Sequence, residues 1–234
     1  MKRTLLSAAV AASALLAQPA AAVDFDVRID NLSNGIYYTP FLAVAHPDGT
    51  ALFEVGQPAS ASLQAMAEGG DIAGLVADVS GLGATVVENP AGGLLAPASS
   101  VTFNMNTDGT SNTLLSVVAM LLPTNDAFAG LNAIEIPTDP GVYTYNVNAY
   151  DAGTEANDEI LNGGGAPGVP GMPADPGGLA GTGGTGAAGV DANTTVHIHR
   201  GALGDTDPAA GASDLDSRVH RWLNPVIRVT ITVN

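Results

Sequence analysis

The chain lacks cysteine and almost lacks lysine. None of its 234 residues is cysteine, which excludes disulfides and thiolate chemistry. The only lysine, Lys2, lies beside Arg3 at the N-terminus, and residues 23–234 carry five arginines against 23 acidic residues, a formal net charge of −18. A surface with this charge repels nucleic acid and anionic lipid and attracts cations, so we expect no nucleic-acid partner. Solubility alone is the alternative explanation for the charge.

Motifs of common catalytic sites are also missing. The sequence contains no G-x-S-x-G, no H-E-x-x-H and no phosphate-binding Gly-Lys-Ser/Thr. The glycines at 163–165 precede no helix signal, so they do not form a dinucleotide-binding loop. We therefore expect that the protein is not an enzyme. No segment reaches the roughly 20 apolar residues that a membrane span needs, so we expect no span.

The N-terminus has the pattern of a cleavable secretory signal. Lys2 and Arg3 precede an apolar run from Leu5 to Leu16, and small residues follow at 20–22. We predict a signal peptide at 1–22 and one domain at 23–234, exported as a secreted or periplasmic protein.

Period-two alternation of apolar and polar residues predicts an all-β fold. It is clearest at residues 23–30, 101–106, 143–149 and 225–233, whereas the mostly apolar run 113–122 indicates a central strand buried on both faces. Pro40 interrupts the strand predicted at 36–45 and favours an edge position or a bulge. Residues 57–79 are the one helical region, which we expect to cover an edge or an end of the sheets. The pattern as a whole indicates an antiparallel β-sandwich.

Residues 161–190 differ in composition from the rest of the chain. Twelve of these thirty residues are glycine and four are proline. Such a segment buries too little apolar surface to offset its ordering entropy, so we expect a flexible, irregular insertion with few anchors.

Two acidic turns suggest a calcium site. Asp151 and Glu155 are four residues apart in a turn that contains Gly153, and carboxylate oxygens suit calcium. Asp126, in the turn 123–126, would join them from another loop at the same end of the sheets. Asn125, Asn157 and Asp158 are candidates for further oxygens or for outer contacts. The alternative is that these acids only begin turns and face solvent.

The same turns carry sequence motifs. Asp126 precedes Phe128-Ala129-Gly130, the sequence Tyr-Asp-Ala-Gly-Thr-Glu spans 150–155, and Pro-x-x-Arg-Val-Thr spans 225–230. Together these motifs resemble the amino-terminal spondin domain of F-spondin and mindin, over the second half of the chain. The sequence departs from that pattern at Ala127, where a Trp is usual, and at Glu155, where an Asp is usual.

This resemblance implies a fold and a function. It implies a C2-like antiparallel β-sandwich that binds calcium in loops at one end, through Asp126, Asp151 and Glu155. It also implies an extracellular adhesion or matrix module whose partner is a protein or a glycan.

The histidines provide an alternative metal site. His197 and His199 lie on the same face of a predicted strand at 193–200, a spacing that is common in copper and zinc sites. His46 and His220 are the remaining histidines and are candidates to complete the site. The alternative function is thus a periplasmic or extracellular copper- or zinc-binding protein, and the alternative to that site is a pair of surface histidines.

Overall fold

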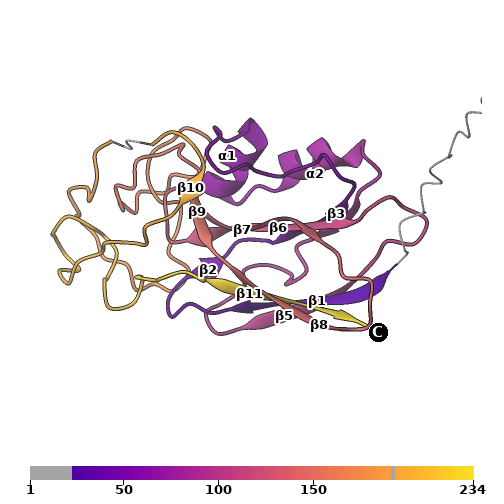
Figure 1. Ribbon diagram of the computed structural model, residues 1–234. Helices are drawn as coiled ribbons and strands as arrows, with labels where there is room; N and C mark the ends of the chain where they lie inside the picture. The colour runs from indigo at the N-terminus through magenta and orange to yellow at the C-terminus, as the bar shows by residue number, and fades with distance from the viewer. Residues whose placement is uncertain (1–22, 191–192) are drawn as a thin grey trace, which may run out of the picture.

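The structure, a computed structural model, describes residues 23–190 and 193–234; the predicted signal peptide lies outside the described residues. Two antiparallel sheets stack face to face, and two helices form a third layer on the outer face of one sheet (Figure 1). The predicted all-β sandwich is therefore confirmed.

One sheet has four strands and the other has seven. The smaller sheet has the order β5-β1-β11-β8, with β5 at Ser100–Asn106, β1 at Asp24–Asn31, β11 at Ile227–Val233 and β8 at Gly141–Val147. The larger sheet has the order β10-β9-β7-β6-β3-β4, with β10 at His197–Ile198, β9 at Ala149–Asp151, β7 at Ala127–Glu135, β6 at Leu114–Leu122, β3 at Leu42–His46 and β4 at Thr85–Glu88. The short strand β2, Tyr37–Tyr38, also pairs with β6.

Alternation of side chains builds the core between the sheets. Phe25, Val27 and Ile29 of β1 are fully buried, while the intervening residues face outward, as the sequence predicts. In β6 nearly every residue is buried, because its second face is covered as well. A second apolar cluster fills the space between this face and the helices α1 (Ala61–Gly69) and α2 (Ala73–Ser80).

Two expectations about this layer are wrong. The helices lie over the face of the larger sheet and not over an edge or an end, because Leu63 and Met66 of α1 pack into the second apolar cluster (Figure 1). Pro40 does not mark an edge, because it falls between β2 and β3, and β3 pairs with β6 on one side and β4 on the other.

The strand predicted at 143–149 is divided between the two sheets. Residues up to Val147 pair with β11 in the smaller sheet, whereas Ala149–Asp151 pair with β7 in the larger one. The chain changes sheet at Asn148, which lies between them. This crossing delivers Asp151 to the end of the larger sheet.

The glycine-rich segment 161–190 is irregular, as expected, but it is anchored. It has no helix or strand, and one bridge joins Leu161 to Met172, whose side chain is fully buried in the main core. Buried Glu68 of α1 accepts a hydrogen bond from the Gly168 N–H at 2.6 Å, and Asp214 accepts from the N–H groups of Leu161 and Gly184. The expectation of few anchors is therefore wrong, since carboxylates from other elements hold the backbone of this segment.

This packing predicts that the segment contributes to stability. Met172→Ala removes a fully buried side chain and should lower the free energy of unfolding by about 2–5 kcal/mol. Leu179→Ala, in the same segment but 55 % exposed, should change it by less than about 0.5 kcal/mol. Denaturant unfolding of both variants checks this, and equal effects would show that the segment does not pack on the core.

Candidate functional site

The pairing of β7 with β9 brings the two sequence motifs together. Ala127 lies opposite Asp151 and Phe128 lies opposite Tyr150 in this antiparallel ladder. Asp126 directly precedes β7, so it and Asp151 meet at the same end of the larger sheet, as the sequence predicts. The Ala152 N–H donates to the Asp126 carbonyl oxygen at 3.2 Å and extends the ladder by one bond.

An aromatic cluster on the outer face fixes this register. The rings of Phe53, Phe128 and Tyr150 pack with centroids 5.0–5.6 Å apart. Gly130 makes room for it, because a Cβ at that position would lie 2.6 Å from the ring of Phe53. Packing in this cluster is sufficient to explain the motif residues Phe128, Gly130 and Tyr150. Phe53 was not predicted as part of the site, and no local sequence signal indicates its contact with Phe128 and Tyr150.

Asp126 is the most deeply buried acid of the site. Its side chain has no exposed surface, and Oδ2 accepts hydrogen bonds from the N–H groups of Thr154 and Glu155 and from the Thr154 hydroxyl. Its second oxygen, Oδ1, is buried and has no hydrogen-bond partner in the part of the chain that the structure describes. Burial first, and then the nearby charge of Asp151, raise the pKa of Asp126 to about 8. Without a cation this carboxyl therefore keeps its proton near neutral pH.

Asp151 is buried beside it in a network of polar groups. Its Oδ1 accepts from the Gly153 N–H at 2.9 Å, and its Oδ2 accepts from the Asn157 side-chain amide at 2.7 Å. Gly153 has φ +70°, and a Cβ there would lie 2.7 Å from the backbone nitrogen of Thr195. The motif glycine is thus required both by its conformation and by the close approach of the chain that leads to β10.

Glu155 lies at the site through its backbone more than through its carboxylate. Its N–H donates to Asp126, but its Oε2 accepts from the Asn125 side chain at 3.3 Å and from the Gly171 N–H at 3.1 Å. Oε1 is buried and has no partner within residues 23–190 and 193–234. Burial is the first cause that raises the pKa of Glu155 to about 7. Asn125 also donates to Asp158, so the candidates Asn125 and Asn157 both orient carboxylates of the site.

The fit of this site to a metal rests on its unpaired oxygens. As they stand, no three acidic or histidine side chains in the described part of the chain are arranged to hold a metal ion. Nevertheless, Asp126 Oδ1 and Glu155 Oε1 are buried acceptors without a donor among the described residues, and the two aspartates lie close enough for one to raise the pKa of the other. A cation beside the aspartates would neutralise the pair, and oxygen atoms are the ligands that calcium prefers.

His197 and His199 share one face, as predicted, but they already have partners. Both Nε2 atoms lie 3.8 Å from Oδ2 of Asp151. In His199, Nδ1 accepts from the Gly201 N–H and Nε2 lies 2.9 Å from Oδ1 of Asn157, so both ring nitrogens are engaged. Burial lowers the pKa of His199 to about 3, and this imidazole is therefore neutral.

The other two histidines do not complete that site. His46 ends β3 opposite Leu114, at the far end of the larger sheet from Asp151, and its Nε2 lies 2.8 Å from the Ser116 hydroxyl. His220 is buried near Asp175 and accepts from the Asp216 N–H. Strand order therefore places His46 far from His197 and His199, whereas the loop residue His220 contacts Asp175 and Asp216.

These features define an antiparallel β-sandwich module with a buried acidic pair at one end. Among the described residues, no helix has the length and apolar character to cross a membrane. A sequence model of the spondin amino-terminal domain family (Spondin_N) matches residues 30–159, which include Asp126, Asp151 and Glu155. The chain belongs to this family, a family of non-enzymatic extracellular modules. No curated protein matches the chain.

The raised pKa values predict a pH-dependent stability in the absence of metal. The carboxyl of Asp126 titrates near its ordinary value of 3.8 in the unfolded chain and near 8 in the folded one. Between these values the folded state binds more protons, so the free energy of unfolding should fall as the pH rises from about 4 to about 8. Melting temperatures measured in chelator across this range check the sign.

Two variants make this measurement specific. Asp126→Asn should flatten the pH dependence, leaving the smaller contribution of Glu155. Asp78→Asn removes the same charge from an exposed position on α2 and should leave the slope unchanged. A slope that is the same in Asp126→Asn as in the original protein would contradict the assigned pKa.

Proposed function

We propose that this protein is an exported, calcium-stabilised binding module of the adhesion or matrix type. Family membership supports the extracellular module. The observation that supports calcium is the buried pair Asp126 and Asp151, together with the unpaired oxygens of Asp126 and Glu155. The predicted signal peptide supports export.

Calcium would supply the positive charge that this end lacks. Asp126 and Asp151 would hold it, with Glu155 as the third acid, and Asn125 and Asn157 would orient the carboxylates. Binding would displace the protons that Asp126 and Glu155 keep near neutral pH, so affinity would increase as the pH rises through about 7 to 8. The bound ion would fix the turns at 123–126 and 151–155 to each other and so stiffen this end.

Thermal unfolding in calcium tests the proposal. A ligand present at 100 times its Kd adds about 2.7 kcal/mol to the free energy of unfolding, which raises the Tm of a chain of this size by roughly 5–10 °C. Asp151→Asn should abolish this rise, and the control Asp78→Asn should keep it. The proposal is wrong if the melting temperature of the chelated protein does not respond to excess calcium.

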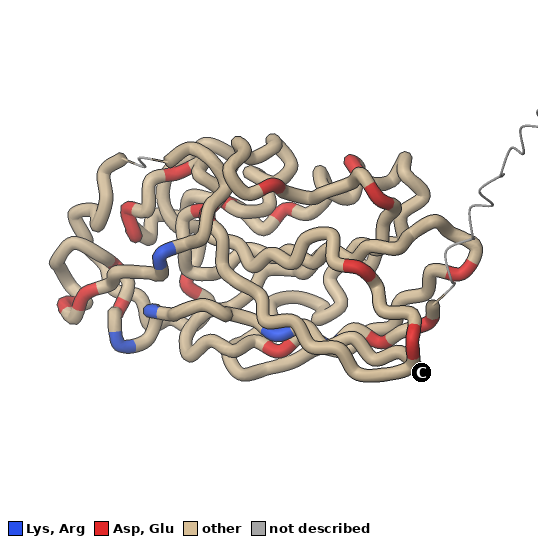
Figure 2. The backbone as a smooth tube through the Cα atoms, in the orientation of Figure 1, with Lys and Arg blue, Asp and Glu red and all other residues tan. Residues whose placement is uncertain are grey.

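The loops at the same end offer a contact surface for a protein partner. Arg200 and Arg221 are exposed and make no ion pair or hydrogen bond within the described residues. They flank a close backbone contact between Gly201 and Trp222, next to Leu223, which is 84 % exposed. Blue segments lie among the loops at this end in Figure 2, where red segments lie as well. Arginine and exposed large apolar side chains are frequent at the centre of protein interfaces.

Adhesion assays test this contact surface. Binding of the calcium-loaded protein to a panel of immobilised extracellular matrix proteins should fall about tenfold or more in Arg200→Ala/Arg221→Ala, because interface arginines often dominate affinity. The double variant Arg28→Ala/Arg228→Ala removes the same charge from β1 and β11 and should bind normally. Equal losses in both double variants would indicate only a general charge effect.

We do not extend the proposal to the copper or zinc alternative. His199 would have to lose both of its hydrogen bonds to become a ligand, and His46 lies at the other end of the sheet. No observation favours that function over calcium.

A further inference from the structure

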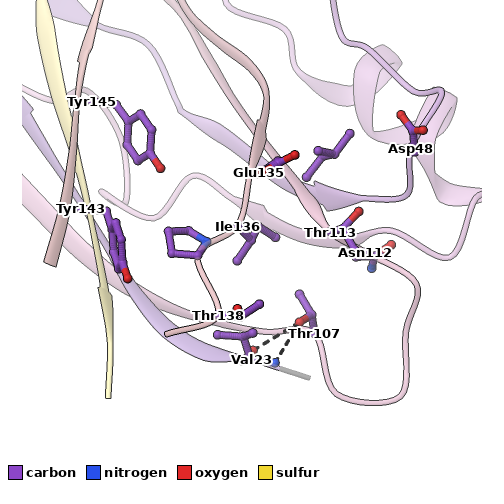
Figure 3. A pocket seen from close by; sticks show the side chains of 12 residues that line it. Val23, Asp48, Thr107, Asn112, Thr113, Glu135, Ile136, Thr138, Tyr143 and Tyr145 are labelled. Atoms are coloured by element: carbon purple, nitrogen blue, oxygen red, sulfur yellow. Dashed lines mark hydrogen bonds between the residues drawn. The ribbon is translucent and has the colours of Figure 1, made fainter. Parts of the chain in front are cut away.

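A cavity opens at the end of the sandwich opposite to Asp126 and Asp151. It has a volume of about 660 Å³, within the range of ordinary small-ligand sites, and it is open to solvent (Figure 3). Strand β7 begins beside Asp126 and ends with Glu135, which lines this cavity. Since a strand rises about 3.4 Å per residue, the cavity lies roughly 25–30 Å from the acidic pair. The two sites therefore share no side chain.

Two tyrosines form one side of this cavity. Tyr143 and Tyr145 are alternate residues of β8, the edge strand of the smaller sheet, so both rings project from the same face towards the cavity (Figure 3). Both are half-buried and pack against the main core. The Tyr143 hydroxyl donates to the Asp139 carbonyl oxygen at 3.0 Å, which fixes that ring. The Tyr145 hydroxyl makes no hydrogen bond within the described residues.

Hydrogen-bond acceptors line the opposite side. The carboxylates of Glu135 and Asp48 are accompanied by the side chain of Asn112 and by the Thr138 hydroxyl. Asn112 is 3 % exposed, and its amide donates to the Gly83 carbonyl oxygen and to the Thr85 hydroxyl. Its Oδ1 is buried and has no partner among the residues described. None of the described residues that line the cavity is Lys or Arg. The cavity thus offers acceptors in excess and repels anions.

This combination selects a chemical class of ligand. The apolar C–H face of a pyranose ring packs on an aromatic ring, while its hydroxyl groups donate to carboxylate and amide oxygens. Uronic or sulfated sugars would place a negative charge beside Glu135 and Asp48. A hydroxyl-rich neutral sugar fits the charge, the acceptors and the tyrosines together.

We propose that this cavity, here called the tyrosine cavity, binds a neutral pyranose oligosaccharide. Tyr143 and Tyr145 provide the stacking surface, and Glu135 and Asp48 accept hydrogen bonds from the sugar hydroxyls. The site adds a second binding end to the proposed function and requires no calcium, so either proposal can fail without the other.

Titration calorimetry with defined sugars tests the tyrosine cavity. The probes are neutral tetrasaccharides built from glucose, mannose, galactose or N-acetylglucosamine, with a uronate tetrasaccharide as the anionic comparison. At least one neutral probe should bind, and Tyr145→Ala should weaken it about tenfold or more because the stacking surface is lost. Thr144→Ala, at the exposed neighbouring position on the opposite face of β8, should leave binding unchanged.

Further variants separate the outcomes. Tyr145→Phe keeps the ring and should retain most of the affinity, which keeps the test decisive if Tyr145→Ala does not fold. Glu135→Gln should weaken binding several-fold, whereas chelator and Asp151→Asn should have no effect. The proposal is overturned if no neutral probe binds at 10 mM (about 1000 times a Kd of ~10 μM), if the uronate binds more tightly, or if Tyr145→Ala and Thr144→Ala bind equally. Binding of a proline-rich peptide at this site in place of every sugar would overturn it as well.

Discussion

The register between β7 and β9 is the constraint on which the candidate site depends. It places Ala127 opposite Asp151, and a shift by one residue would turn every side chain of the short strand β9 to the other face. The rings of Phe53, Phe128 and Tyr150 hold that register from the outer face. The consequence is electrostatic, because two carboxyl groups that are distant in sequence are buried side by side. Such a pair needs either a bound proton or a bound cation. The packing of three aromatic rings thus determines the chemistry at the end of the larger sheet where the two aspartates lie.

Carboxylates also organise the part of the chain that has the fewest apolar residues. Glu68, Glu159, Asp175, Asp205 and Asp214 each accept hydrogen bonds from backbone N–H groups of the loops between 161 and 216. Glycine-rich backbone is well suited to this, because no Cβ blocks the approach of a carboxylate to successive N–H groups. Some of the acidic side chains therefore face inward. Their carboxylates accept the backbone hydrogen bonds that a neighbouring strand would accept in a sheet. Composition alone predicts an acidic surface exposed to solvent and a weakly anchored loop. Neither prediction holds for these five acids and the loops that they bind.

The sequence predicts what depends on local pattern and misses what depends on strand order. The alternation in β1 and β11 and the double burial of β6 follow from period two and from apolar runs, and the structure confirms them. The meeting of Asp126 with Asp151 was predictable because both lie at strand ends and belong to known motifs. The place of His46 was not, because only the pairing of β3 with β6 decides to which end of the sheet it goes. The helices were recognised, but their position on a face depended on the second apolar cluster, to which residues far apart in the sequence contribute.

The proposed calcium end and the tyrosine cavity act independently for a physical reason. Their separation of roughly 25–30 Å along β7 exceeds the Debye length of about 8 Å at physiological salt, so the charge at one end has little effect on the other. The strands β6 and β7 run between the two ends. All of β6 after Leu114 is buried, and so is β7 from Ala127 to Leu131. Two independent ends on one rigid sandwich suit a molecule that links two different surfaces, since each end adds its own free energy of binding and a second contact forms at high effective concentration once the first is made.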